Sequence, residues 1–263
     1  MLKALAYLLT IIFYIAFLIL LLFFQAVQWV CFNFFGYQAH KKSVDYLNFC
    51  IMKCLLLMGT RFTFKNDFRF KRNCPHIIVT NHQGEYDIPP IIWYLRRLHP
   101  KFISKKELGR GVPSVSYNLR HGGSALIDRK DKEQAIREIK KLTDMVRETN
   151  RSIVIFPEGT RSRDGVPSEF ARGGLTTLFE ALPNAKVIPI TIHNSYKLLR
   201  WGQFPLCPGA HITHTVHGEL AVADHEPLEL VQKIQDIILA DFPEIRPRKK
   251  GPTPINPTDT DAQ

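Results

Sequence analysis

The first forty residues constrain this chain more than any other stretch. From Ala4 to Phe24 the sequence ALAYLLTIIFYIAFLILLLFF contains no charged residue, and residues 1–40 hold one Lys or Arg, Lys3, and no Asp or Glu. A helix of this length, rising 1.5 Å per residue, can cross a hydrocarbon core of about 30 Å. The apolar region of a cleaved signal peptide is shorter, about 7 to 15 residues. The run therefore predicts a retained membrane anchor.

A second apolar stretch follows Lys41 and Lys42. It reads YLNFCIMKCLLLMGTRFTF, residues 46–64, and is interrupted by Lys53 and Arg61. Such a stretch is typical of a helix at the membrane interface. Two arrangements stay open: one membrane span plus a surface helix, or two helices that dip into one leaflet. If the first run spans the membrane, two lysines after it, against one before it, favour a following domain on the cytoplasmic side, at the inner membrane in a bacterium.

The charge of the chain indicates phosphate-bearing partners. The formal net charge is +11, and almost all of it lies after residue 40. Such an excess suits either nucleic acid or anionic lipid. Residues 62–70, FTFKNDFRF, interleave aromatic rings with Lys65 and Arg69, as single-strand nucleic-acid binders do. Beside a membrane anchor, contact with lipid headgroups is the better explanation, so we expect a membrane partner and no nucleic acid.

Short apolar runs alternate with amphipathic stretches from about residue 75. The candidate strands are HIIVT (76–80), KFIS (101–104), SALID (124–128), SIVIF (152–156), KVIPITI (186–192) and HITHTVHGEL (211–220). The clearest helical periodicity covers residues 131–149. This alternation predicts an α/β fold, with a largely parallel sheet flanked by helices and an N-terminal membrane-anchoring helical segment.

The domain organisation follows from these patterns. We expect a hydrophobic anchor of one or two helices over residues 1–64 and a catalytic domain over residues 65–245. Residues 246–263 are rich in proline and polar residues without periodicity, which predicts a disordered tail. The five cysteines form no Cys-x-x-Cys pair, so we expect neither disulfides nor a zinc site.

Two polar loops follow predicted strands. The stretch TNHQGEYDIPP, residues 80–90, places His82 and Asp87 directly after one strand, and FPEGTRSRDG begins at the end of another. Ligands of open α/β sheets bind beyond the carboxyl ends of the strands. The two loops are therefore expected to share one edge of the sheet.

The first loop offers a base and a group that orients it. A carboxylate near an imidazole can hold one tautomer and stabilise the protonated ring. Residues 81–87 contain no Ser, Cys or Thr, which argues against a covalent acyl-enzyme. The histidine would instead take a proton from a substrate hydroxyl. Taken alone, His82 and Asp87 could equally be capping or surface residues.

The second loop offers arginines that suit an anion, and a separate run of histidines does not suggest a metal site. The planar fork of Arg161 suits phosphate, although a solvated charged turn would explain the same residues. His211, His214 and His217 recur every three residues. In a strand the middle one faces away from the other two, so we expect no shared metal.

Together these blocks resemble the glycerolipid acyltransferases. Asn81-His82 with Asp87 is similar to their His-x-x-x-x-Asp signature, and FPEGTRS (156–162) is similar to their phosphate-binding motif. Residues 105–129 and 187–192 match further blocks in the expected order. The resemblance covers about residues 75–195. It is strongest to the 1-acylglycerol-3-phosphate acyltransferase type, which makes phosphatidic acid from an acyl thioester and lysophosphatidic acid.

The resemblance implies roles for individual residues. His82 would be the general base on the acceptor hydroxyl, and Asp87 would orient it. The acceptor phosphate would be bound by four residues of the second loop: Glu158, Gly159, Thr160 and Arg161. Lys105 and Arg129 are candidates for contact with the phosphate or with the thioester oxyanion.

The implied partners are an acyl donor carried on coenzyme A or acyl carrier protein, a lysophospholipid acceptor and the membrane, with no metal or other cofactor. Family members often have a lysine after the phenylalanine downstream of the phosphate motif, where this chain has Phe170-Ala171-Arg172. The acceptor therefore stays open. Alternatives are another lyso-lipid acceptor, transacylation between phospholipids, or a non-catalytic basic domain that binds anionic lipid by charge alone.

Overall fold

The computed structural model describes residues 2–128 and 130–242, so the predicted tail at 246–263 lies outside the described residues. Eight strands form one sheet in the order β1-β7-β6-β2-β5-β3-β4, with β8 pairing to β6. The strands are β1 (Arg61–Lys65), β2 (His76–Thr80), β3 (Pro100–Lys105), β4 (Ala125–Ile127), β5 (Ser152–Ile155), β6 (Lys186–His193), β7 (His211–Val216) and β8 (Leu220–Ala221).

Most neighbouring strands are parallel, as predicted. The pairs β2–β5, β2–β6, β3–β5, β3–β4 and β1–β7 are parallel, whereas β7 and β8 run antiparallel to β6. The helices are α1 (Leu2–Cys54), α2 (Ile88–Tyr94), α3 (Val115–His121), α4 (Lys132–Thr149), α5 (Arg172–Ala181), α6 (Ser195–Leu198) and α7 (Pro227–Ala240). The predicted helix over residues 131–149 is therefore confirmed, with Asp131 as its N-cap.

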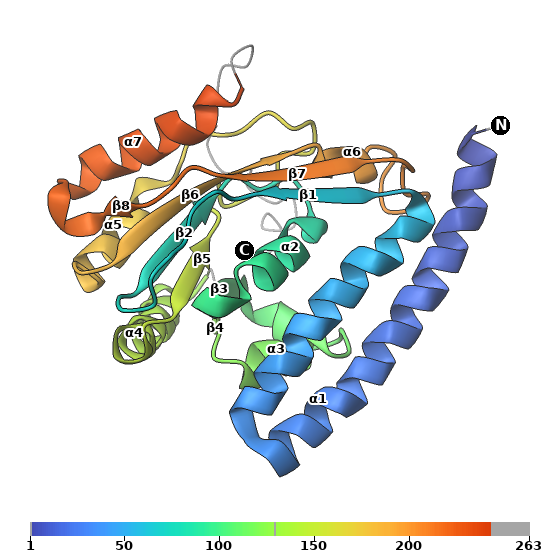
Figure 1. Ribbon diagram of the computed structural model, residues 1–263, viewed down its shortest axis with the longest axis horizontal. Helices are drawn as coiled ribbons and strands as arrows, with labels where there is room; N and C mark the ends of the chain where they lie inside the picture. The colour runs from blue at the N-terminus through green and yellow to red at the C-terminus, as the bar shows by residue number, and fades with distance from the viewer. Residues whose placement is uncertain (1, 129, 243–263) are drawn as a thin grey trace, which may run out of the picture.

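Helices cover both faces of the sheet (Figure 1). Alternate residues of β2 point to opposite faces, as the pleat requires. Ile77 and Val79 join a core formed with α4, α5 and α7, while Ile78 joins a second core formed with α1 and α2. Because both faces of the central strands are buried, the middle residues of β2 and β5 are consecutive apolar side chains, as in other sheets covered on two sides.

Helix α1 is a hairpin of two arms. Gly36 interrupts the helix with φ 77° and ψ −175°, a backbone conformation that only glycine adopts readily. The arms lie side by side along one flank of the domain (Figure 1). One face of the first arm is buried against the domain, including Phe13, whereas Leu8, Ile15 and Phe23 on the other face are more than half exposed. By length and composition, α1 with the following turn is the one described helix that could cross a membrane.

Three sequence predictions differ from the structure. The stretch 46–64 is not one interfacial helix: the second arm ends at Cys54, a 3-10 turn covers Leu55–Met58, and Gly59 leads into β1. The boundary predicted between residues 64 and 65 falls inside β1, which pairs with β7. The predicted strand 211–220 is divided into β7 and β8 around Gly218, whose φ is 95°.

Candidate active site

The two polar loops leave the same edge of the sheet. Strands β2 and β5 are parallel neighbours, with Val79 opposite Ile155. The loop that begins at Asn81 and the loop that begins at Phe156 therefore start side by side. Direct contacts join them: the backbone N–H of Ser162 donates to the carbonyl of His82 at 2.8 Å, and the Ser162 hydroxyl donates to the same oxygen at 3.1 Å.

His82 and Asp87 form the predicted pair. The Nδ1 of His82 lies 2.8 Å from Oδ2 of Asp87. The same oxygen accepts the backbone N–H groups of Gln83 at 2.7 Å and Gly84 at 2.9 Å. Burial alone would raise the pKa of the Asp87 carboxyl, but the hydrogen bond and charge of His82, with further donors, hold that pKa below its usual value. Asp87 is thus a fully buried carboxylate that accepts three hydrogen bonds.

This pattern sets the tautomer of His82. An ionised carboxylate only accepts hydrogen bonds, so the proton lies on Nδ1 and the lone pair on Nε2. The imidazole stacks on Phe156, with ring centroids 4.1 Å apart. Its side chain is 17% exposed. Nε2 can therefore act as a base towards a ligand at the sheet edge.

The buried side chain of Glu158 joins the two loops by hydrogen bonds. One carboxylate oxygen accepts the backbone N–H of His82 and the other accepts that of Ser168, each at 2.8 Å. The residue is 1% exposed. Burial raises the pKa of its carboxyl to about 7, although the two N–H groups act in the opposite direction. Both oxygens of Glu158, which the resemblance implies as a phosphate-binding residue, thus accept backbone N–H groups and join the two loops.

Three residues at the tip of the second loop face solvent. Gly159, Thr160 and Arg161 are exposed, and Gly159 has a φ of 71°. The guanidinium of Arg161 forms an ion pair with Glu85, which lies between His82 and Asp87 in the chain. The arginine is therefore brought beside the His82 loop, with its charge satisfied by a carboxylate.

The two remaining predicted cations are placed differently. Lys105 is exposed at the carboxyl end of β3, the same edge of the sheet as the loops. Among the described residues, no hydrogen bond or ion pair joins its side chain to His82 or Arg161. Arg129 lies outside the described residues.

Three residues support the His82 loop through contacts that the sequence did not predict. The Asn81 side chain pairs with both backbone groups of Ile192, at 2.9 and 2.7 Å. Gln83 accepts the backbone N–H of Ser195 at 2.9 Å. His214 is fully buried, and its Nε2 lies 3.2 Å from the carbonyl of Asp87. The signal for Asn81 and Gln83 was polarity immediately after a buried strand.

The three histidines near β7 have separate partners. His211 contacts the hydroxyl of Thr63, and His217 contacts the hydroxyl of Thr191. Burial lowers the pKa of His214 to about 4, so this ring is neutral near pH 7. In the part of the chain that the structure describes, no group of three His, Cys, Asp or Glu side chains could hold a metal ion.

Comparison with known proteins identifies the family. The acyltransferase family matches residues 61–193, which include both loops, and this match covers half of the chain. The chain belongs to the acyltransferase family. The family membership predicted from the motifs is therefore confirmed.

Several relatives share this region. The 1-acyl-sn-glycerol-3-phosphate acyltransferase of Helicobacter pylori is 36% identical over 125 residues, which are 46% of this chain and 50% of that protein. The chloroplastic 1-acyl-sn-glycerol-3-phosphate acyltransferase BAT2 of Brassica napus is 27% identical over 170 residues, 63% of this chain and 45% of the relative. The matches thus span about half the length of these curated relatives.

A solved structure shares the fold. The crystal structure of the 1-acyl-sn-glycerophosphate (LPA) acyltransferase PlsC from Thermotoga maritima matches with a TM-score of 0.76 and 22% identity. The match covers 94% of this chain and 100% of that chain. It therefore includes the helical hairpin as well as the sheet, and it supports the fold of the acyltransferase family.

Proposed function

We propose that this protein transfers a fatty acyl group from an acyl thioester to the free hydroxyl of lysophosphatidic acid, which gives phosphatidic acid. One observation carries the proposal: a histidine held by a buried aspartate stands on the same sheet edge as an exposed arginine loop. This arrangement supplies a base and an anion clamp. The names of the similar proteins from Helicobacter pylori and Brassica napus agree with this activity.

The proposed reaction proceeds in two balanced steps. Nε2 of His82 accepts the proton of the acceptor hydroxyl while that oxygen attacks the thioester carbonyl carbon. The resulting tetrahedral oxyanion collapses, the carbon–sulfur bond breaks, and the thiolate leaves with the proton from the imidazolium. Asp87 stabilises the imidazolium between these steps. Lys105 and Arg129 are proposed to lie near the developing negative charge.

Arg161 is proposed to bind the acceptor phosphate. Its side chain is 44% exposed and is paired with that of Glu85, which is 38% exposed. A phosphate can bind the guanidinium with two parallel hydrogen bonds and carries more charge than a carboxylate. The phosphate would therefore displace Glu85. Gly159 and Thr160 would line the same site, and Glu158 would act by holding the loop.

A second acceptor class is favoured by Glu85 itself. A carboxylate beside the acceptor site would attract a cationic headgroup and disfavour a dianionic phosphate. An acceptor with an amine in its headgroup, a lyso-aminolipid, would leave the Glu85–Arg161 pair intact. The donor is proposed to be an acyl thioester, carried on either coenzyme A or acyl carrier protein.

The hairpin is proposed to hold the enzyme in one leaflet of a membrane, with the catalytic domain on the cytoplasmic side. Its first arm presents an apolar face while its other face packs on the domain. The hydroxyl of Tyr14 donates to the carbonyl of Gln203 at 2.7 Å, and the Thr10 hydroxyl accepts the N–H of Leu206 at 3.0 Å. These contacts favour shallow insertion, because crossing the bilayer would remove the arm from the domain.

A substrate panel tests the proposal. Purified full-length protein in neutral lipid nanodiscs would receive lysophosphatidic acid, lysophosphatidylcholine or a lyso-aminolipid, each with acyl-coenzyme A or acyl carrier protein. Products would be measured by mass spectrometry. We expect phosphatidic acid to form fastest. Exclusive acylation of the lyso-aminolipid would favour the second candidate, product without any added donor thioester would indicate transacylation, and no product with any pair would leave only lipid binding.

A further inference from the structure

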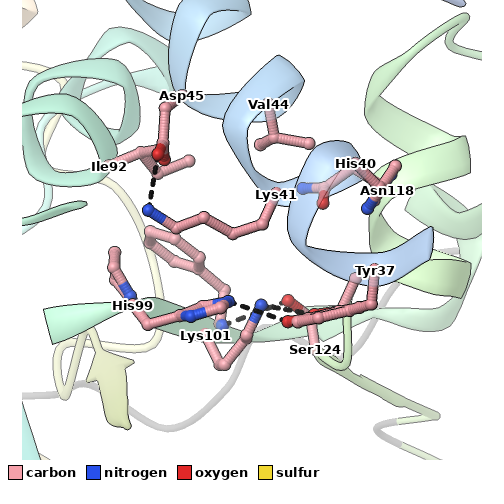
Figure 2. Close-up of a pocket in the computed structure, with 13 residues that line it drawn as sticks. Tyr37, His40, Lys41, Val44, Asp45, Ile92, His99, Lys101, Asn118 and Ser124 are labelled. Atoms are coloured by element: carbon pink, nitrogen blue, oxygen red, sulfur yellow. Dashed lines mark hydrogen bonds and ion pairs between the residues drawn. The ribbon is translucent and has the colours of Figure 1, made fainter. Parts of the chain in front are cut away.

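A cationic cavity lies at the edge of the sheet opposite the catalytic loops. It is lined by Tyr37, His40, Lys41 and Asp45 of the second α1 arm, by His99, Lys101 and Phe102 around β3, and by Asn118 and Ser124 (Figure 2). Lys101 is the second residue of β3, whereas the catalytic loops follow the carboxyl ends of β2 and β5. Because β3 runs parallel to β5, the cavity is separate from the Arg161 loop.

The charges around this cavity do not balance. Lys41 pairs with Asp45, and Figure 2 shows the lysine side chain reaching across the cavity to that carboxylate. Asp45 is the only carboxylate lining the cavity in the described residues. Lys101 is 5% exposed and donates to a neutral carbonyl, that of Gly122. Arg151 adds a third positive charge over the ring of Tyr37 at 4.7 Å.

A buried lysine without a counter-charge is costly. Burial, with the nearby charges of Arg151 and Lys41, lowers the pKa of Lys101 to about 7. The cost can be removed by loss of the proton or by an anion that enters the cavity.

The cavity also has a donor without a partner. His40 is fully buried, and neither ring nitrogen has a hydrogen-bond partner among the described residues. Its ring packs edge-on to Phe32 and Tyr117, with centroids 5.5 and 5.7 Å away. A buried polar atom that stays unpaired costs about 1 to 3 kcal/mol. An anion in the cavity would accept the imidazole N–H.

We propose that this cavity is a binding site for one small oxyanion with the chemistry of phosphate, held by Lys101 and His40 and bordered by Lys41. The anion would join the second arm of α1 to β3 and so stabilise the hairpin on the sheet. It could be free phosphate or a lipid headgroup. Headgroup access is supported by the exposed side chain of Tyr46 and by the stacking of Arg96 on Trp93 at 4.4 Å, a combination common at membrane interfaces.

The test measures thermal stability against added inorganic phosphate. The full-length protein would carry Arg161→Ala, so that the proposed acceptor site does not contribute. Phosphate should raise the melting temperature progressively, as expected for a ligand that binds the native state, and sodium chloride of equal ionic strength should not. Lys101→Met should remove the phosphate response and should melt higher than its parent without phosphate, because the buried charge that lacks a counter-charge is removed.

Two further variants keep the test decisive. Lys140→Met, an exposed lysine on α4, is the matched control and should retain the full response. His40→Phe preserves the aromatic packing and should weaken phosphate binding at least tenfold even if Lys101→Met fails to fold. The proposal is wrong if the parent shows no phosphate response, if chloride reproduces that response, or if both site variants respond like the parent.

Vesicles identify the source of the anion. Binding would be compared on phosphatidylcholine vesicles with and without 20% phosphatidylglycerol. If Lys101→Met loses the preference for anionic vesicles and Lys140→Met keeps it, the site takes a lipid headgroup. If Lys101→Met keeps the preference but has lost the phosphate response, the site takes free phosphate. Neither result depends on acyl transfer, so the proposed function can fail independently.

Discussion

Replacing Asp87 by asparagine separates the charge of the His82–Asp87 pair from its geometry. Oδ2 of Asp87 accepts hydrogen bonds from His82, Gln83 and Gly84. The amide nitrogen of an asparagine cannot occupy that position, because it would face three donors. The amide oxygen must take it. His82 therefore keeps its Nδ1–H tautomer in the variant and loses only the negative charge beside it.

The expected loss follows from that charge. Two unit charges about 4 Å apart interact by about 4 kcal/mol at an effective dielectric constant of 20. If between half and all of this energy is realised when His82 becomes protonated in the transition state, the loss is about 2 to 4 kcal/mol. Asp87→Asn should then lower kcat by roughly 30- to 1000-fold.

The assay is steady-state acyl transfer with both substrates saturating, together with a thermal melt. Asp67→Asn, at an exposed position, controls for the change in net charge and should keep wild-type kcat. The reasoning is refuted if folded Asp87→Asn turns over within threefold of the wild type, because the carboxylate would then not stabilise the imidazolium.

Three other substitutions test separate parts of the structure. Arg161→Ala should raise the acceptor KM by about 10- to 150-fold, equivalent to 1.5 to 3 kcal/mol. Arg161→Lys should raise it by less, and neither variant should change the donor KM. A change confined to the donor KM would contradict this role. Glu158→Gln can accept only one of two backbone N–H groups and should lose about 1 to 3 kcal/mol of unfolding free energy at pH 5. Burial raises the Glu158 pKa to about 7 from an ordinary 4.5. As the pH rises from 4.5 to 7, the wild type should therefore lose stability relative to the variant. Parallel plots of unfolding free energy against pH for the two proteins would contradict a raised Glu158 pKa. Phe13→Ala should lower the unfolding free energy by about 3 to 5 kcal/mol in chemical denaturation, whereas Ile15→Ala, on the exposed face of the same arm, should lower it far less. Equal losses would mean that the arm does not pack on the domain.

The helices and strands that the local sequence predicted are those in which buried apolar residues recur at regular spacing. Strand β2 is buried at all five residues, and α4 has an apolar face at helical spacing. Strand β1 lacks such a signal: its two ends are exposed and it follows an apolar helix without a break in composition. Its partner β7 is about 150 residues away, so its pairing depends on contacts that no local window contains.

The site shows the same division. The contact between His82 and Asp87 was predictable because both follow one strand within a single short loop. The role of Glu158 was not, since a carboxylate in a polar loop can face a ligand or backbone N–H groups, and only the packing of the two loops decides which. The sequence could not single out Lys101 within its predicted strand, because the lysine becomes buried without a counter-charge only when α1 packs against β3.

His82→Ala gives the most direct test of the central claim, that this chain is an acyltransferase whose base is His82. Product formation from lysophosphatidic acid and an acyl thioester would be followed by mass spectrometry for the wild type and for the variant at equal folded concentration. Since general-base catalysis contributes about 10² to 10⁴, the account predicts a kcat lower by at least 100-fold with an unchanged thermal melt. Near-normal phosphatidic acid formation by folded His82→Ala would contradict it.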